Sequence, residues 1–176
     1  SIFSNLEIFL NDKIKKIEFN LDMLDQKFIA ESMRLLPKDN YVGFSITQGN
    51  KYRKKTWAIG NFIKLANELH LKGKKIVFFV EKNEIDLVKL IKTNLPQAIF
   101  PEHESKIACP ALVTALGSRL ERAISIDNGV MHMLSLAKIP LIVLFGPTDS
   151  YKFAPKNENV KILDSKSIYN SNDINK

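Results

Sequence analysis

The fold of this chain is decided by the stretch Ile124-Ser125-Ile126-Asp127-Asn128-Gly129-Val130-Met131-His132 and by its continuation Pro140-Leu141-Ile142-Val143-Leu144-Phe145-Gly146-Pro147-Thr148. Each stretch contains a short apolar run that stops at a polar turn, and a helix-like segment lies between the two runs. This order of strand, turn, helix and strand collects polar residues where the strands end. In open α/β sheets ligands bind just outside those ends, and a helix N-terminus there offers free N–H groups to an anion. The stretch therefore predicts a site for a phosphate-bearing ligand.

From residue 41 onward, apolar runs alternate with amphipathic segments. Strands are expected at residues 41–46, 75–80, 98–100, 123–126, 141–145 and 160–163. Helices are expected at residues 56–71, 84–93, 110–120 and 130–137, the first two capped by Thr56 and Asn83. Continuous apolar strands that alternate with helices predict a parallel sheet covered on both faces. The predicted fold class is α/β, a Rossmann-like three-layer domain with a parallel sheet.

Residues 1–36 contain no motif and differ from the regular pattern that follows. Residues 5–10 and 25–36 have the apolar spacing of short amphipathic helices, and residues 16–21 alternate like an edge strand or an extended connector. We therefore expect residues 1–36 to be a connector with packing helices, and residues 37–176 to be the Rossmann-like domain. The polar residues 165–176 are expected to fray or to dock as a short helix.

Composition narrows the class of protein only in part. The chain has 176 residues, 26 Lys and Arg against 19 Asp and Glu, and a net charge of +7. Nucleic acid, an anionic membrane surface or a phosphorylated ligand could each explain that charge, as could a Lys-rich solvated surface. The basic residues lack the interleaved aromatic residues of a nucleic-acid stacking platform, so we expect no nucleic acid. The single Cys109 cannot form an internal disulfide, which favours a reducing compartment.

The apolar runs and the first residues of the chain bear on its location and on whether it is a fragment. No apolar run reaches the roughly 18 residues that a bilayer span needs, and the first residues do not form a signal peptide. The sequence begins at Ser1 without an initiator Met. We therefore expect a cytoplasmic chain that is an excised fragment or a processed product.

Polar residues after the first two strands are candidates for ligand binding. The loop after the first strand carries Ser45, Thr47, Gln48, Lys51, Arg53, Lys54 and Lys55. Its cations predict either a phosphate clamp, with Lys55 nearest the following helix, or a solvated basic loop. After the second strand, Glu81 or Glu84 could accept hydrogen bonds from ribose hydroxyls. Alternatively, Glu84 favours the first turn of its own helix through the helix dipole.

The turn after the fourth strand is the strongest candidate. Gly129 permits a positive φ and a close approach of a ligand to the backbone. His132 falls in the first turn of the next helix, where it could donate to a phosphate oxygen. Asn128 provides a polar side chain at the turn, and Asp127 either faces the ligand or orients the loop through backbone N–H groups.

Other kinds of site fail a direct check. The sequence contains no P-loop, no G-x-G-x-x-G fingerprint and no G-x-S-x-G elbow. Its three histidines and one cysteine lack metal-ligand spacing. Hydrolytic triads and zinc sites are therefore not expected, and neither is a cofactor or a metal.

Three motifs occur together in the order typical of one enzyme family. They are K-x-W at Lys55–Trp57, D-x-G-x-x-H at Asp127–His132 and F-G-P-T at Phe145–Thr148. With these motifs the chain resembles the family 9 glycosyltransferases, the lipopolysaccharide heptosyltransferases and their relatives, from about Tyr41 to Pro155. The pair of later motifs is fairly specific, whereas K-x-W alone is not.

The resemblance implies a GT-B architecture, in which two Rossmann-like domains enclose the active site. The C-terminal domain binds a nucleotide-diphosphate sugar, typically ADP-heptose, without a metal. The positions of Lys55 and of the turn from Gly129 to His132 in the family's motifs imply that they hold the diphosphate. In the same way, Glu84 (or Glu81 nearby) is implied to reach the ribose. Thr47, Asp127 and Asn128 complete the expected donor site. Asn128 stands where heptosyltransferases commonly carry Thr, which leaves the identity of the sugar open.

In the family, the acceptor site and the proposed catalytic Asp belong to an N-terminal domain that residues 1–36 are too short to supply. We therefore expect the donor-binding half of an enzyme, with no catalytic residue of its own and no activity alone. The resemblance implies transfer to a lipid A–core acceptor at the cytoplasmic face of the inner membrane, with peripheral membrane contact. The alternative is a non-catalytic Rossmann-like module that binds a polyanion or a protein partner.

Overall fold

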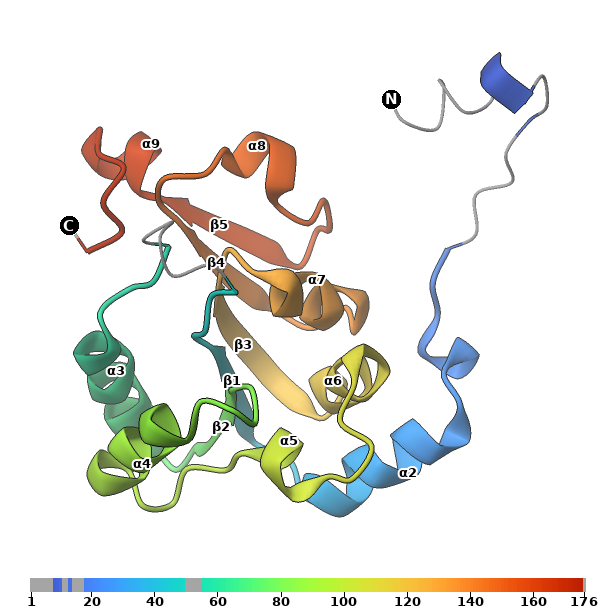
Figure 1. Cartoon of the computed structure of the whole chain (residues 1–176), viewed down its shortest axis with the longest axis vertical. Coiled ribbons are helices and arrows are strands. Elements are labelled where there is room, and N and C mark those ends of the chain that lie inside the picture. Colours follow the sequence, from blue (N-terminus) through green and yellow to red (C-terminus); the bar gives the residue numbers. More distant parts are fainter. Residues whose placement is uncertain (1–7, 11–12, 14–17, 50–54, 176) are drawn as a thin grey trace.

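The chain forms a five-stranded sheet with helices on both faces (Figure 1). The computed structural model describes residues 8–10, 13, 18–49 and 55–175. The strands are β1 (Tyr41–Ser45), β2 (Lys75–Phe79), β3 (Leu120–Ile126), β4 (Leu141–Phe145) and β5 (Val160–Asp164). They pair in the order β2-β1-β3-β4-β5, and every pair is parallel. The predicted α/β fold with a parallel sheet is confirmed.

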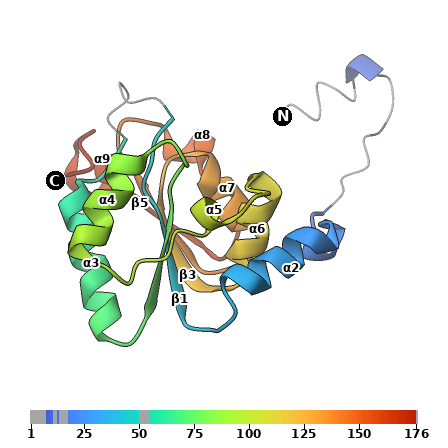
Figure 2. The same ribbon diagram turned by 60° about the horizontal axis from the view of Figure 1, so that its bottom comes forward.

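The helices form two layers, one on each face of the sheet (Figure 2). One layer contains α2 (Gln26–Leu35), α6 (Pro110–Gly117) and α7 (Gly129–Leu136), whose apolar residues share a single core cluster. The opposite layer contains α3 (Ile59–Leu71) and α4 (Ile85–Asn94), which belong to a second cluster. Short elements complete the structure: η1 (Leu21–Met23), α5 (Pro101–Glu104), α8 (Ser150–Phe153) and α9 (Ser165–Tyr169).

Strand β1, between β2 and β3 in the sheet, contributes side chains to both cores. Tyr41 faces the α6 and α7 side, whereas Val42 and Phe44 face the α3 and α4 side. The Phe44 ring stacks on Phe78 at 5.2 Å and meets Phe62 edge to face at 6.2 Å. Each fully buried Phe contributes about 1.5–3 kcal/mol through its burial. This packing fixes the end of β1, where the candidate site begins.

Several predicted helix boundaries are wrong. Helix α3 begins at Ile59 with Ala58 at its N-cap, so Thr56 does not cap it. The Ala58 N–H donates instead to Oδ1 of Asn175, a residue far away in the sequence. Helix α4 has Glu84 at its N-cap rather than Asn83. At the start of α3, a tertiary contact with Asn175 therefore takes the place of the local cap that the sequence predicted.

Two predicted strands also differ in extent. Residues 98–100 make only an isolated bridge, Val77 to Ile99, because the chain turns into α5 at Pro101. Helix α6 ends at Gly117, and β3 already begins at Leu120, which pairs with Tyr41. Because β3 pairs with β1 from Leu120 onward, residues 120–122 belong to the strand, whereas their apolar spacing had predicted the end of a helix and a turn.

The N-terminal segment reaches the domain through α2. Asp25 caps this helix by accepting from the Lys27 N–H, and Leu35 and Leu36 are buried in the core beside α6. Residues 18–20 form no strand, and residues 8–10 are helical. The remaining residues of the two predicted N-terminal elements, 5–7, 16 and 17, lie outside the described residues. At the other end, residues 165–169 form the short helix α9, which is one of the two predicted alternatives. Within the described ranges, no helix has both the length and the apolar character needed to cross a bilayer.

Candidate functional site

The strand order places a crevice between β1 and β3. The chain leaves β1 toward β2 on one side, and the later strands add on the other side, so the direction of winding reverses there. A hollow of about 460 Å³ lies at this point, within the range of small-molecule sites. The loops after β1 and β2, helix α5 and the starts of α6 and α7 line it, with Thr47, Glu81, Asn128 and Gly129 among the lining residues. We call this space the switch-point hollow.

Asn128 ties the ends of β1 and β3 together. It is the N-cap of α7, where its Oδ1 accepts from the N–H of Met131 at 3.0 Å. Its Nδ2 donates to Ser45 Oγ and to the Thr47 carbonyl, both at 2.8 Å. Both ends of the side-chain amide are therefore engaged by the protein. Asn128 and Thr47, two predicted site residues, are brought together, and the Asn128 side chain holds the loops after β1 and β3 in place at the edge of the hollow.

Gly129 is the first residue of α7 and lines the switch-point hollow. Gly129 does not use the positive φ that glycine permits: among the described glycines only Gly73 has one. A Cβ atom built on Gly129 meets nothing within 4 Å, so open space lies beside the backbone. The first N–H groups of a helix have no intrahelical partner and carry the positive end of the dipole. The geometry therefore allows an anion to approach the start of α7 closely.

Lys55, in the segment before α3, forms an ion pair with Asp127, which directly follows β3. The Lys55 Nζ lies 2.5 Å from Asp127 Oδ2, and the two side chains are only 13% and 8% exposed. The same oxygen accepts from Thr148 Oγ1, and the Lys55 N–H donates to Gln48 Oε1. Asp127 thus contacts side chains rather than the backbone N–H groups considered from the sequence. The cluster holds a cation in place next to the start of α7.

His132 lies in the first turn of α7 and is exposed. Its side chain forms no hydrogen bond or ion pair with any residue of the described part of the chain. It is therefore available to a ligand at the helix start. The predicted phosphate-clamp residues Lys51, Arg53 and Lys54 lie outside the described residues.

The two candidate carboxylates for ribose lie in different hollows. Glu81, in the loop after β2, lines the switch-point hollow together with Gly129. Glu84 lines a second hollow of about 360 Å³, on the α3 side of β1, with Trp57 and Phe62. Thr47 lines both. The structure therefore brings Glu81, rather than Glu84, into the same space as the start of α7.

Two side chains of the site were missed in the sequence. Thr148, the last residue of the F-G-P-T motif, holds Asp127, and its place at the end of β4 could have indicated this. Glu102 of α5 also lines the switch-point hollow. Burial raises the pKa of its carboxyl group to about 7, the negative charge of Glu81 adds to this, and Lys82 opposes it. No pattern in the sequence marks Glu102.

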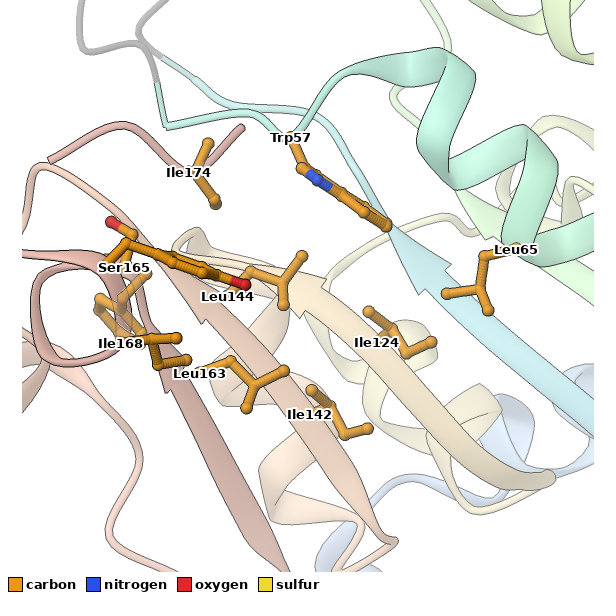
Figure 3. Close-up of a pocket in the computed structure, with 11 residues that line it drawn as sticks. Trp57, Leu65, Ile124, Ile142, Leu144, Leu163, Ser165, Ile168 and Ile174 are labelled. Atoms are coloured by element: carbon orange, nitrogen blue, oxygen red, sulfur yellow. The ribbon is translucent and has the colours of Figure 1, made fainter. Parts of the chain in front are cut away.

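A third hollow is apolar and separate from these polar groups. It measures about 270 Å³ and lies over β3, β4 and β5, where Trp57 faces the short helix α9 across Leu144 (Figure 3). Trp57 also packs edge to face on Phe62 at 5.1 Å. None of the predicted donor-site residues lines this hollow. The Trp of the K-x-W motif therefore belongs to an apolar surface, whereas the Lys belongs to the polar site.

Comparisons with known proteins agree with this architecture. The model of glycosyltransferase family 9 (heptosyltransferase) matches residues 9–176. No curated protein matches the sequence. Among solved structures, E. coli ADP-heptose LPS heptosyltransferase II has a TM-score of 0.65 and 16% identity, over 80% of this chain and 44% of its own. The family 9 glycosyl transferase from Veillonella parvula DSM 2008 has a TM-score of 0.68 and 18% identity, over 86% and 48%.

The E. coli heptosyltransferase WaaC was solved with ADP and with ADP-2-deoxy-2-fluoro heptose. The structure with ADP has a TM-score of 0.62 and 17% identity, over 76% of this chain and 42% of its own. The structure with the fluorinated donor has the same TM-score and 18% identity, over 89% and 47%. These likenesses show a shared α/β fold. The chain spans less than half the length of each of these structures.

Proposed function

Because the chain belongs to glycosyltransferase family 9, we propose that it is the donor-binding half of a sugar transferase that uses a nucleoside-diphosphate sugar. One observation carries the proposal. The open space at Gly129 and the start of α7 lie at the topological switch point of the sheet, and the Lys55 cation is paired with Asp127, two residues before Gly129. That is where a doubly wound sheet binds an anionic ligand. The apolar hollow over β4 offers no comparable groups.

The proposed chemistry is direct displacement at the anomeric carbon of the donor. As the bond to the sugar breaks, negative charge accumulates on the leaving diphosphate. The N–H groups at the start of α7, the Lys55 ammonium group and the exposed His132 would stabilise that charge. Asp127 and Thr148 position Lys55 and do not react themselves. The group that takes the acceptor's proton is proposed to lie on a second domain.

Geometry favours Glu81 over Glu84 for the ribose. A carboxylate in the loop after β2 can accept hydrogen bonds from both ribose hydroxyls, as acidic residues do in dinucleotide-binding folds. Glu81 lines the hollow that contains Gly129, whereas Glu84 lines the neighbouring one. Thr47 and Asn128 connect β1 and α7 behind the diphosphate.

An ADP-heptose-like donor is the favoured substrate, supported by the fold that the chain shares with WaaC, which was solved with ADP and with an ADP-heptose analogue. The proposed acceptor is the lipopolysaccharide core, reached at the inner membrane through the second domain. The isolated chain is proposed to bind the donor without transferring the sugar.

The proposal is tested by titrating the 176-residue chain with ADP in a calorimeter. We expect weak but measurable binding that is reduced by His132→Ala and by Lys55→Ala. Lys89→Ala on α4, an exposed lysine outside the hollow, is the matched control and leaves the affinity unchanged. Absence of binding by ADP and by other nucleoside diphosphates at millimolar concentration would refute the site. Salt-dependent binding of nucleic acid or anionic vesicles without nucleotide preference would favour the polyanion-binding module instead.

A further inference from the structure

Residues 172–175, after α9, contact both segments that supply the side-chain partners of Asp127, and we call them the C-terminal clasp. The first segment is residues 55–58, which contain the K-x-W motif and form neither helix nor strand. The second is the F-G-P-T motif at the end of β4. Lys55 comes from the first segment and Thr148 from the second, and both contact the same carboxylate oxygen. A contact that fixes these segments therefore affects where Lys55 lies.

Asn175 of the clasp supplies the hydrogen-bond partner at the start of α3. Its Oδ1 accepts from the Ala58 N–H at 2.6 Å, and its Nδ2 donates to the Thr56 carbonyl at 3.5 Å. Ala58 is the N-cap residue of α3, and no side chain caps this helix locally. One side chain of the clasp therefore holds the backbone on both sides of Trp57.

Gly146 of the F-G-P-T motif lets the clasp approach the end of β4. A Cβ atom built on Gly146 would lie 3.0 Å from the Asn172 carbonyl oxygen and 3.2 Å from Ile174 Cβ, so a larger residue would push the clasp away. Ile174 is buried and lines the apolar hollow together with Trp57 (Figure 3). The clasp therefore packs against both motifs at once.

A series of hydrogen bonds connects the clasp to the end of β5. Ser165, the first residue of α9, is buried, and its Oγ donates to the Ser171 carbonyl at 2.7 Å. Ser171 Oγ then accepts from the Asp173 N–H at 3.1 Å. Asp173 Oδ1 accepts in turn from the Asn175 N–H at 2.9 Å. The clasp is therefore attached to the sheet through α9.

On the basis of the proposed donor site, we propose that the C-terminal clasp positions Lys55 for the leaving diphosphate. The Lys55 end of residues 55–58 is fixed by Asp127 and Gln48, and Asn175 fixes the other end. Asn175 does not line the switch-point hollow, so it is a positioning residue that acts through this backbone. A segment that is already fixed loses less conformational freedom when the donor binds, which favours binding.

The test compares variants of the 176-residue chain by calorimetric titration with ADP and by the fluorescence emission of Trp57, its only tryptophan. Asn175→Ala removes the partner of the Ala58 N–H. We expect about fivefold weaker ADP binding, since a helix cap accounts for about that factor in an equilibrium constant. The Trp57 emission should shift to longer wavelength, because the released segment exposes the indole ring to water. Circular dichroism checks that each variant is folded.

Gly146→Ala displaces the clasp by another route and leaves Asn175 in the chain. It should weaken ADP binding by a similar factor and shift the Trp57 emission in the same direction. In the double variant Gly146→Ala with Asn175→Ala, the second change should add little, because the clasp is already displaced. Two unrelated structural losses would instead multiply, so this cycle separates positioning by the clasp from general damage.

Asn175→Asp keeps the accepting oxygen and tests whether the hydrogen bond to Ala58 is the cause. The positive end of the α3 dipole favours the new charge and Asp173 opposes it, so we expect ADP binding within about twofold of the wild type. Asn172→Ala is the matched control. It removes an exposed side chain of the clasp but keeps the carbonyl oxygen next to Gly146, and it should behave as the wild type.

Unchanged ADP affinity or unchanged Trp57 emission in Asn175→Ala overturns positioning by the clasp and leaves the donor site standing. The same conclusion follows from a multiplicative loss in the double variant, or from a loss in Asn175→Ala that Asn175→Asp does not recover. Failure of the wild-type chain to bind ADP overturns the proposed function, and the role of the clasp with it.

Discussion

The ammonium nitrogen of Lys55 lies 2.5 Å from Oδ2 of Asp127, and both side chains are largely buried. The two residues are 72 positions apart: Lys55 lies in the segment before α3, and Asp127 directly follows β3. Thr148, at the end of β4, donates to the same carboxylate oxygen. One carboxylate therefore joins the segments that follow β1, β3 and β4, and it holds a cation near the site where a diphosphate is proposed to bind.

Lys55→Ala should lower both stability and affinity. It leaves the Asp127 carboxylate buried without its cation, which costs about 3 kcal/mol of unfolding free energy, as for other broken buried pairs. The measurement is urea unfolding followed by circular dichroism. The double variant Lys55→Met with Asp127→Leu removes both charges and should recover most of that stability without recovering ADP binding. A loss below about 0.5 kcal/mol in Lys55→Ala would place the pair among weak surface pairs.

Asn128 should stabilise the folded chain through two separate sets of hydrogen bonds, the cap of α7 and the bonds to the end of β1. Asn128→Ala loses the cap of α7 and the bonds to Ser45 and Thr47, for a cost of about 2–4 kcal/mol. Asn128→Ser keeps a capping oxygen for the Met131 N–H and should recover about 1 kcal/mol of that loss. Thermal or urea unfolding of the two variants measures both differences. Equal stability of the two variants would show that the cap contributes nothing here.

Gly129→Ala should separate binding from stability. The added methyl group meets open space in the folded chain, and Ala favours a helix over Gly, so stability should stay equal or rise by up to about 1 kcal/mol. ADP affinity should fall at least about tenfold, since the methyl group narrows the approach to the start of α7. Gly60→Ala is the matched control, because Gly60 lies in the first turn of α3 and also has open space around its Cβ position. If the two variants bind ADP equally well, the diphosphate does not approach Gly129.

Glu102 should make stability depend on pH. Its pKa is raised in the folded chain to about 7 from an ordinary value of 4.5, so the folded state holds this proton more tightly than the unfolded state. The contribution of Glu102 to stability is therefore highest below pH 4.5 and declines as the pH rises to 7. Glu102→Gln should be more stable than the wild type at pH 8, by about 1–3 kcal/mol, with a smaller difference at pH 5. A gain that is the same at both pH values would mean that ionisation of Glu102 is not its cause.

The order of the elements could be predicted because parallel strands buried on both faces leave continuous apolar runs between amphipathic helices. The turn after β3 was also visible, since Asp127, Asn128 and Gly129 interrupt such a run just before a helix. The same sequence could not reveal that Asn128 donates to Ser45 and Thr47, because those partners lie on another strand. It equally could not place Glu81 and Glu84 in different hollows, since the path of the chain after β2 decides that.

Other misses have the same origin in tertiary structure. The pattern favoured Thr56 as a helix cap, but the backbone N–H of Ala58 finds its partner on Asn175. Of the two properties that glycine offers at position 129, the structure uses the absence of a side chain, which leaves open space, and not a positive φ. Glu102 carries no local signal, because its raised pKa depends on burial and on Glu81.

The most direct test of the donor site is the backbone amide resonance of Gly129 during an ADP titration of the isotope-labelled chain. We expect the largest shift changes at Gly129 and its neighbours at the start of α7, with smaller changes at Glu81 and Thr47. Changes confined to the apolar hollow around Trp57 and Tyr169, or no change at millimolar ADP, would contradict the assignment of the start of α7 as the diphosphate site.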